Sequence, residues 1–407
     1  PDSGGYVLAT GHSSRAQLST AGKKAVAYFP GTPGFDPSAL ASIVQPAACG
    51  FCRNRTGLRN RGKGNMPKTC IMAVAMIFSC ACSAGEVVKF HTIADPVYTK
   101  PASLVDIGKG QRLNLYCLGS GSPAVIFDAG IGDSTISWAL VQPAISKKTM
   151  ACSFDRAGLG FSDAARRPST AANQTEDLHA LLQAAHVKPP YVLVGHSMAG
   201  MNVRVYADRY RDEVAGMVIV DGAHEDQRER FRSVDPEKAE YHKKEDDAYL
   251  QKLRKCVGYA EKGLVEGTPE FRLCVSDFGL PDSRYSAAIN AAQEKYAITP
   301  RWQAANVSEE ENFAYASANE TRATRKDFGD MPIFVLTHAP RQKSKDETQD
   351  VRNRLTLVWE ELHSDVAAMS TRGVNIIVPN SKHYIQYDHP QIVVDTVLEA
   401  VNIARGQ

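Results

Sequence analysis

The sequence has little net charge that would attract the whole molecule to a charged partner. Lys and Arg number 47 against 45 Asp and Glu in a chain of 407 residues, so the formal net charge is only +2. A strongly basic or acidic chain creates a long-range field that favours nucleic acid or a charged membrane surface, and this composition creates none. We therefore expect no nucleic-acid partner, and a ligand must be recognised by a local site.

The chain also lacks, near its start, an apolar run long enough to form a permanent membrane span. Residues 70–78 are apolar, but the run has about half the length that a transmembrane helix needs. Lys68 precedes the run and small residues follow it up to Ala84, which is the layout of a secretory signal peptide. We interpret residues 66–84 as that signal peptide, with a buried N-terminal helix as the alternative. The protein is then expected to be secreted or periplasmic.

Residues 1–65 lack methionine and lack any sustained pattern of apolar residues, but they contain many Gly, Pro and Ser. A segment of this composition buries too little apolar surface to fold alone. We interpret residues 1–65 as a disordered extension upstream of the natural start at Met66, while their place in the natural protein stays open.

Nine cysteines are present, of which five precede the expected cleavage near residue 84. Export permits disulfides between the others. Cys256 and Cys274 lie in a segment expected to be helical, and we predict that they pair. Cys117 and Cys152 lie in apolar runs typical of strands, where a buried free thiol is the commoner state.

From about residue 103 the sequence alternates short apolar runs with longer helical patterns, which is typical of a mostly parallel sheet covered on both faces. The runs expected to form eight strands are 103–107, 112–118, 124–127, 150–154, 191–194, 214–220, 332–336 and 374–378. The alternation stops in the charged segment 224–330. We predict an α/β fold whose core comprises residues 85–223 and 331–407, with 224–330 as a helical cap above the carboxyl ends of the strands.

The segment 195–200, Gly-His-Ser-Met-Ala-Gly, follows an apolar strand and leads into a helical pattern. A serine hydroxyl reacts well when a sharp strand-to-helix turn presents it to a base. We predict that Ser197 is the nucleophile. Ala199 stands where the usual motif has its second glycine, and it is small enough to preserve the turn. His196 is too close to the serine to act as its base and is expected to pack inside the pocket.

The base and the acid must follow later strands. His383 lies in the loop after the last strand, where its neutral imidazole can accept the serine proton, whereas His389 precedes a proline and is typical of a helix start. Asp221 ends the sixth strand and is the predicted acid. Asp346 or Glu347, which follow the seventh strand, are the alternatives, and a turn or capping carboxylate is the structural alternative for Asp221.

A glycine turn at 128–132 follows the third strand. Acyl transfer needs two backbone N–H groups that bind the oxyanion, and we assign them to Met198 and Ile131. A second glycine-rich turn at 155–163 is expected to be structural, because its two glycines and its Asp and Arg suit a tight connection.

With these segments, the chain resembles the α/β-hydrolase superfamily, especially bacterial capped hydrolases and esterases, over about residues 103–405. The motifs that carry the resemblance are 128–132, 155–163, 195–200, 220–227 and 383–385. The resemblance implies a Ser-Asp-His mechanism with a covalent acyl-enzyme, without metal or cofactor. Relatives with an Asp nucleophile, such as dehalogenases and epoxide hydrolases, are disfavoured because Ser197 occupies that turn.

We therefore predict a carboxylic-ester hydrolase that acts on a small-molecule ester. The same three residues also serve amide or carbon-carbon bond hydrolysis and cofactor-free haloperoxidation, which are the alternative reactions. A non-catalytic ligand receptor is a third possibility, which an intact Ser197 and His383 disfavour. The physiological substrate, the preferred acyl chain and the oligomeric state depend on tertiary packing, and the sequence does not predict them.

Overall fold

A computed structural model describes residues 17–21, 24–28 and 92–407. Its centre is a sheet with the strand order β1-β2-β10-β9-β8-β7-β5-β6-β4-β3. The strands are β1 (Gln17–Ala21), β2 (Lys24–Tyr28), β3 (Leu104–Asp106), β4 (Arg112–Leu118), β5 (Ala124–Asp128), β6 (Ala151–Phe154), β7 (Tyr191–His196), β8 (Val214–Val220), β9 (Ile333–His338) and β10 (Gly373–Val378). Strands β5 to β10 are mutually parallel, and β4 pairs antiparallel with β6. All eight predicted strands are present as β3 to β10, so the predicted α/β sheet is confirmed.

The two remaining strands lie within residues 1–65, which the sequence predicts to be disordered. β1 pairs antiparallel with β2, and β2 adds in parallel to β10. The prediction is wrong for these ten residues. The segment 24–28, Lys-Ala-Val-Ala-Tyr, is short and largely apolar, and the free edge of β10 offers it a row of backbone hydrogen-bonding groups. The expected signal peptide at 66–84 lies outside the described residues.

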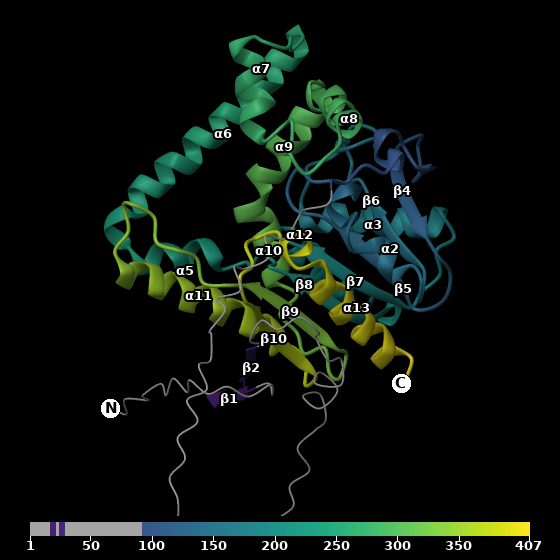
Figure 1. Ribbon diagram of the computed structural model, residues 1–407, viewed down its shortest axis with the longest axis vertical. Helices are drawn as coiled ribbons and strands as arrows, with labels where there is room; N and C mark the ends of the chain where they lie inside the picture. The colour runs from purple at the N-terminus through teal and green to yellow at the C-terminus, as the bar shows by residue number, and fades with distance from the viewer. Residues whose placement is uncertain (1–16, 22–23, 29–91) are drawn as a thin grey trace, which may run out of the picture.

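Helices cover both faces of the sheet (Figure 1). The α-helices outside the 224–330 segment are α2 (Gln142–Ile145), α3 (Ala171–Ala184), α4 (Ala199–Arg209), α11 (Gln349–Ala367), α12 (Ile385–Asp388) and α13 (Pro390–Ala404), and short 3-10 helices lie at η1 (Pro96–Thr99), η2 (Thr135–Trp138) and η3 (Arg211–Glu213). One apolar cluster joins α3, α4 and α11 to one face, and another joins α2 and α13 to the opposite face. In the central strands, successive residues enter opposite clusters, as Val192 and Leu193 do, because successive side chains of a strand point to opposite faces.

The segment between β8 and β9 is helical, as the sequence predicts for the cap. It contains α5 (Gln227–Val234), η4 (Pro236–Lys238), α6 (Ala239–Lys262), α7 (Pro269–Cys274), η5 (Ser276–Phe278), α8 (Ala287–Ala297), α9 (Pro300–Asn312), a π-helical turn η6 (Phe313–Ser317) and α10 (Ala318–Arg322). In Figure 1, α6 extends away from the sheet to α7, and α9 returns toward it. A separate apolar cluster that includes Trp302 and Ala305 packs α6, α7, α8 and α9 together and reaches Leu159 of the core. The insertion is therefore a packed unit that rests on the sheet domain.

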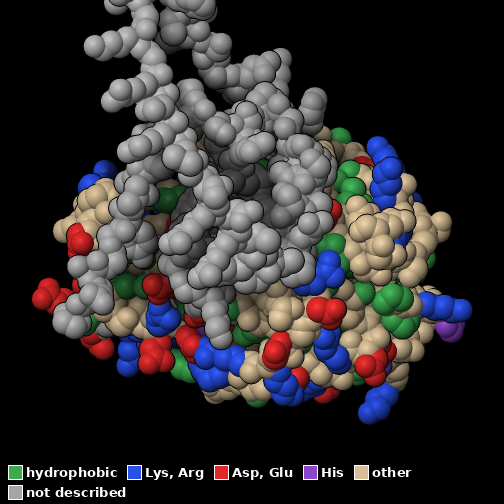
Figure 2. Space-filling model, turned by 90° about the horizontal axis from the view of Figure 1, so that it is seen from below, with side chains coloured by type: hydrophobic (Ala, Val, Ile, Leu, Met, Phe, Trp, Pro, Cys, Tyr) green, Lys and Arg blue, Asp and Glu red, His purple; other side chains and the backbone are tan. Residues whose placement is uncertain are grey.

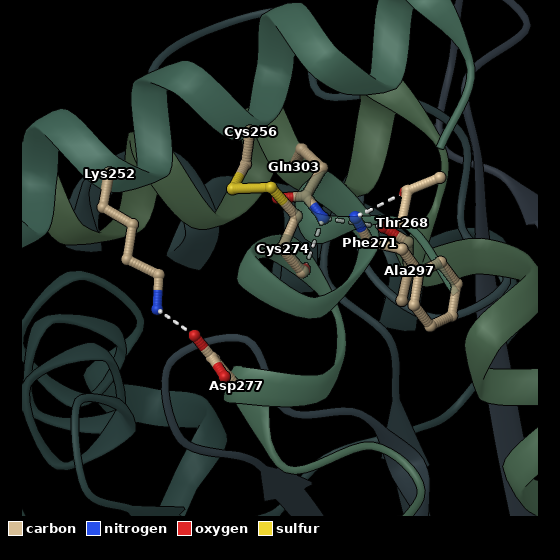
Figure 3. The surroundings of a disulfide bond; sticks show 8 residues. All are labelled: Lys252, Cys256, Thr268, Phe271, Cys274, Asp277, Ala297 and Gln303. Carbon is tan, nitrogen blue, oxygen red and sulfur yellow. Dashed lines mark hydrogen bonds and ion pairs between the residues drawn. A yellow bond between two sulfur atoms is a disulfide. The ribbon is translucent and has the colours of Figure 1, made fainter. Parts of the chain in front are cut away.

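Both cysteine pairs are disulfide-bonded. The bond between Cys256 and Cys274 joins α6 to α7, as predicted, and Figure 3 shows it between the two helices. The prediction of free thiols at Cys117 and Cys152 is wrong, because these residues also form a disulfide. They are direct partners in the antiparallel pairing of β4 with β6, and their Cα atoms lie 4.0 Å apart. Residues that face each other in this way bring their side chains close together.

The described surface fits the balanced composition. Figure 2 shows Lys and Arg side chains interspersed with Asp and Glu side chains on the described part of one face. Within residues 92–407 and the first two strands, no helix is both long enough and apolar enough to cross a membrane.

The disulfide between β4 and β6 yields a stability prediction. Replacing Cys117 and Cys152 together by Ala should lower the free energy of unfolding by about 4 kcal/mol, because the bond restricts the unfolded chain across a loop of 35 residues. Urea denaturation of the double variant and the wild type measures the difference. A peptide map of the unreduced protein that finds Cys117 and Cys152 as separate thiols contradicts the assignment.

Candidate active site

Ser197 occupies a sharp turn between β7 and α4. Its φ angle is +52°, a conformation that a non-glycine residue seldom adopts and that is typical of strained functional turns. The small neighbours make the turn possible: a Cβ atom on Gly195 would lie 2.5 Å from the Ala199 carbonyl oxygen, and one on Gly200 would lie 2.8 Å from Gly222 Cα. Gly200 therefore allows close packing of the helix start against the loop after β8. The small side chain of Ala199 is accommodated in the turn.

The structure brings the three predicted side chains together. His383 Nε2 lies 2.9 Å from Ser197 Oγ, and His383 Nδ1 lies 2.6 Å from Asp221 Oδ2. Ser197 follows β7, Asp221 follows β8 and His383 follows β10. The carboxyl ends of parallel strands meet at one edge of a sheet, so side chains far apart in the sequence converge there.

Asp221 is buried and accepts several hydrogen bonds besides that of His383. Its carboxylate oxygens lie 2.7 and 2.8 Å from His338 Nδ1, and one of them accepts hydrogen bonds from Trp359 Nε1 at 3.0 Å and from the His338 backbone N–H at 3.1 Å. Burial alone would raise the pKa of this carboxyl, but the hydrogen bonds of the two histidines hold the pKa well below its usual range. Asp221 is thus an anion whose acceptor sites are filled.

His338 and Trp359 are members of the site that the sequence did not suggest. His338 is the last residue of β9, the strand that precedes the alternative acids Asp346 and Glu347. Its Nε2 accepts a hydrogen bond from Arg341 Nε at 3.0 Å, so its Nδ1 carries the proton that is donated to Asp221. A histidine at a strand end, two residues before a proline, was the only local signal for it.

The other candidate acids have different partners. Glu347 forms an ion pair with Arg352, whose Nη2 lies 2.6 Å from its carboxylate. The backbone carbonyl of Asp346 accepts a hydrogen bond from Lys238. His389 is the N-cap residue of α13, as predicted for a helix start. Of these three carboxylates, Asp221 is the one that is hydrogen-bonded to the His383 ring.

The predicted oxyanion donors lie beside the serine. Met198 is buried and directly follows Ser197, and Ile131 belongs to the turn after β5. The two side chains share a small apolar cluster with Met201, Ala223 and Phe313. Ile131 and Ser197 line the same cavity, so the turn after β5 faces the nucleophile.

A buried ionic network holds this turn in place. Arg156 donates to the carbonyl oxygens of Ala129 and Gly130, and it pairs with Asp128 at 2.7 Å and with Glu309 at 2.6 Å. Burial would lower the pKa of Arg156, but the two carboxylates hold it above its usual range. Glu309 also accepts a hydrogen bond from the backbone N–H at position 132, at 2.8 Å. The loop 155–163 therefore has the predicted structural role, and α9 of the insertion takes part in it.

His196 packs inside the site, as predicted. Its ring is fully buried, its Nε2 lies 3.1 Å from the His383 carbonyl oxygen, and burial lowers its pKa to about 3. A neutral His196 ring adds no positive charge next to the His383 imidazole, the predicted base.

The chain after Asp221 is fixed by a second buried ion pair. Glu225 receives two hydrogen bonds from Arg204 of α4, at 2.6 and 2.9 Å. Next to it, His224 Nδ1 accepts a hydrogen bond from the Asp226 backbone N–H at 3.1 Å, and burial lowers the pKa of His224 to about 4. This segment carries the chain from the acid to the insertion.

A cavity of about 1210 Å³ opens above Ser197 and His383. Phe231 and Phe313 of the insertion and Trp359 of α11 give it apolar walls, and charged side chains of α5 and α6 line it farther out. Among the described residues, no group of His, Cys, Asp or Glu side chains has the arrangement of a metal site.

Comparisons with known proteins agree with this architecture. A family model described as the alpha/beta hydrolase fold matches residues 123–246. The uncharacterized protein YqjL of Bacillus subtilis is 26% identical over 275 residues, which cover 68% of this chain and 82% of that protein.

Two solved structures illustrate the likeness of fold. A candidate epoxide hydrolase from Pseudomonas aeruginosa has a TM-score of 0.54 at 15% identity, covering 74% of this chain and 96% of that one. A candidate lipase from Acinetobacter baumannii has a TM-score of 0.52 at 18% identity, covering 76% and 94%. At such identities the likeness concerns the fold alone.

The lowered pKa of His224 makes stability depend on pH. The ordinary value is 6.5 and the folded value about 4, so the unfolded chain binds a proton between these values that the folded protein does not. The contribution of neutral His224 to the free energy of unfolding is fully present above about pH 6.5 and is lost as the pH falls toward 4. Wild type should therefore lose more free energy of unfolding over this range than His224→Asn, as measured by urea denaturation at several pH values. His186→Asn, at an exposed position, is the control and should behave like wild type, whereas equal slopes for wild type and His224→Asn would contradict the prediction.

Proposed function

Because the chain belongs to the α/β-hydrolase superfamily, we propose that it is a serine hydrolase that cleaves carboxylic esters through an acyl-enzyme. One observation carries the proposal: a single imidazole, His383, is hydrogen-bonded to Ser197 Oγ at 2.9 Å and to the buried carboxylate of Asp221 at 2.6 Å. This arrangement fits proton transfer from a serine hydroxyl to a histidine held in one tautomer.

In the first step, Ser197 Oγ attacks the ester carbonyl carbon and its proton passes to His383 Nε2. The charge on the resulting imidazolium is stabilised by Asp221, which remains an anion because its oxygens already accept other hydrogen bonds. The carbonyl oxygen becomes an oxyanion, and the backbone N–H groups of Met198 and Ile131 bind it.

Collapse of this intermediate breaks the bond to the alcohol oxygen, which takes the proton from His383 Nε2 and leaves. The acyl group is then bound to Ser197 Oγ. A water molecule gives a proton to His383 and attacks the acyl carbon, and collapse of the second intermediate releases the acid and returns the proton to Ser197. Ser197 and His383 thereby return to their initial protonation states.

Two features favour an ester over the substrates of relatives that use an aspartate. The turn residue is a serine, whose acyl ester is hydrolysed in the second step as described. The wall formed by Phe231, Phe313 and Trp359 beside the serine suits an apolar acyl group. The proposed substrate class is thus a small-molecule carboxylic ester with an apolar acyl portion.

We also propose that the protein works outside the reducing cytosol. The disulfides Cys117–Cys152 and Cys256–Cys274 support this location, since such bonds persist mainly in secreted and periplasmic proteins.

Replacing the nucleophile tests the proposal directly. Ser197→Ala should lower kcat for p-nitrophenyl acetate and p-nitrophenyl butyrate by about 10⁴-fold or more, because the acyl-enzyme no longer forms. Ser146→Ala, at the C-cap of α2 outside the cavity, is the matched control and should keep wild-type rates. Equal rates for Ser197→Ala and wild type would exclude Ser197 as the nucleophile.

The acid is tested by a pair of substitutions. Asp221→Asn should lower kcat by roughly 10⁴-fold, because an amide does not hold the required tautomer of His383 or stabilise its charged form. Asp346→Asn lies in the same cavity and should retain most of the activity. The opposite ranking would move the acid to the loop after β9.

A further inference from the structure

A second cavity of about 1070 Å³ adjoins the one above Ser197. His383 and residues 339–341 line both cavities. Ser197 and Ile131, by contrast, line the first cavity and are not among the described residues that line the second. The two cavities therefore adjoin each other at His383 and residues 339–341.

Among the described residues that line this second cavity, basic side chains outnumber acidic ones. Arg284, Arg341 and Lys382 line it, and Asp388 is the acidic residue among its described lining residues. Asp388 Oδ2 accepts a hydrogen bond from the Lys382 backbone N–H at 2.6 Å, which occupies one of its oxygens but leaves its charge unchanged. The cavity thus carries an excess of positive charge.

Two of these cations are available to a ligand. Arg341 and Lys382 are exposed, and within the described part of the chain no carboxylate lies within ion-pair distance of either. Arg341 uses its Nε to contact His338, so its two terminal NH₂ groups are left to form the planar fork that matches a carboxylate. Arg284 differs, because it pairs with Asp282 and its guanidinium lies 4.1 Å from the ring centre of Tyr387.

The path of the leaving alcohol decides which part of a substrate lies near these cations. In the proposed mechanism the alcohol oxygen departs toward His383 Nε2, which protonates it, whereas the acyl group stays bound to Ser197. The alcohol portion of the ester therefore lies next to His383, and an extended alcohol portion passes from there into the second cavity.

We propose that the second cavity binds a carboxylate in the alcohol portion of the substrate, through Arg341 and Lys382. The inference rests on the proposed ester hydrolysis, because that reaction fixes which end of the ester faces His383. The substrate class becomes an ester with an apolar acyl group and an anionic alcohol.

A pair of esters tests the proposal in the full-length protein. The first is 4-(butanoyloxy)benzoate, and the second is the neutral 4-(butanoyloxy)benzamide of nearly the same shape. Wild type should prefer the benzoate, and Lys382→Gln should lower the ratio of the two kcat/KM values by about tenfold through loss of one charge-assisted contact. Lys147→Gln, at an exposed lysine that lines neither cavity, should leave the ratio unchanged. An unchanged ratio in Lys382→Gln would overturn the proposal.

A third ester locates the effect on one side of the substrate. The monoester of glutaric acid with p-nitrophenol carries its carboxylate in the acyl portion. Its kcat/KM, relative to that of p-nitrophenyl butyrate, should not change in Lys382→Gln. An equal loss for this ester would mean a general attraction of anions and would overturn a specific site for the alcohol portion.

Binding to Ser197→Ala separates this proposal from the proposed function. Titration calorimetry should detect 4-hydroxybenzoate binding more tightly than 4-hydroxybenzamide, and adding Lys382→Gln should weaken the benzoate by about tenfold. If no ester is hydrolysed by wild type but this difference in binding is found, the proposed function fails and the carboxylate site stands. If esters are hydrolysed and both compounds bind equally, the carboxylate site is excluded and the hydrolase proposal stands.

Discussion

The hydrogen bond between His383 and Asp221 is the interaction on which the arrangement of the site depends. Asp221 is fully buried, and a carboxylate in such a place is stable only when donors surround it. The donors come from the end of β9, from α11 and from the loop after β10. The carboxylate of Asp221 thus contacts all three segments. The position of His383 opposite Ser197 therefore depends on how β8, β9, β10 and α11 pack together.

A second buried charge, that of Arg156, fixes the turn on the opposite side of Ser197. Arg156 binds the carbonyl groups of the turn after β5 and joins that turn to Glu309 in the insertion. The N–H groups that face an oxyanion must be fixed before the reaction, since their reorientation would cost free energy at the transition state. The two networks thus hold the predicted base, His383, and the turn after β5 separately, each from a different side of β7.

The sequence predicted those features that local patterns determine. The eight core strands follow from their apolar runs, and the turn at Ser197 follows from small residues between a strand and a helix. Asp221 and His383 could be placed because parallel strands end at one edge. His338 could not be predicted, since its contact with Asp221 depends on the neighbouring positions of β8 and β9 in space. The disulfide between Cys117 and Cys152 was missed for a similar reason, because the register of two antiparallel strands is not visible in either strand alone.

The contact of Glu309 with Arg156 also bears on how molecules enter the first cavity. If the whole insertion swung away as a rigid lid, α9 would withdraw its carboxylate and leave a guanidinium buried with one counter-ion fewer, which is costly. α5 and the first residues of α6 line the same cavity, and the ion pair that ties α5 to α11, Arg230–Glu361, is exposed to solvent. Because an exposed ion pair contributes little to stability, displacing this flank costs less free energy than displacing α9.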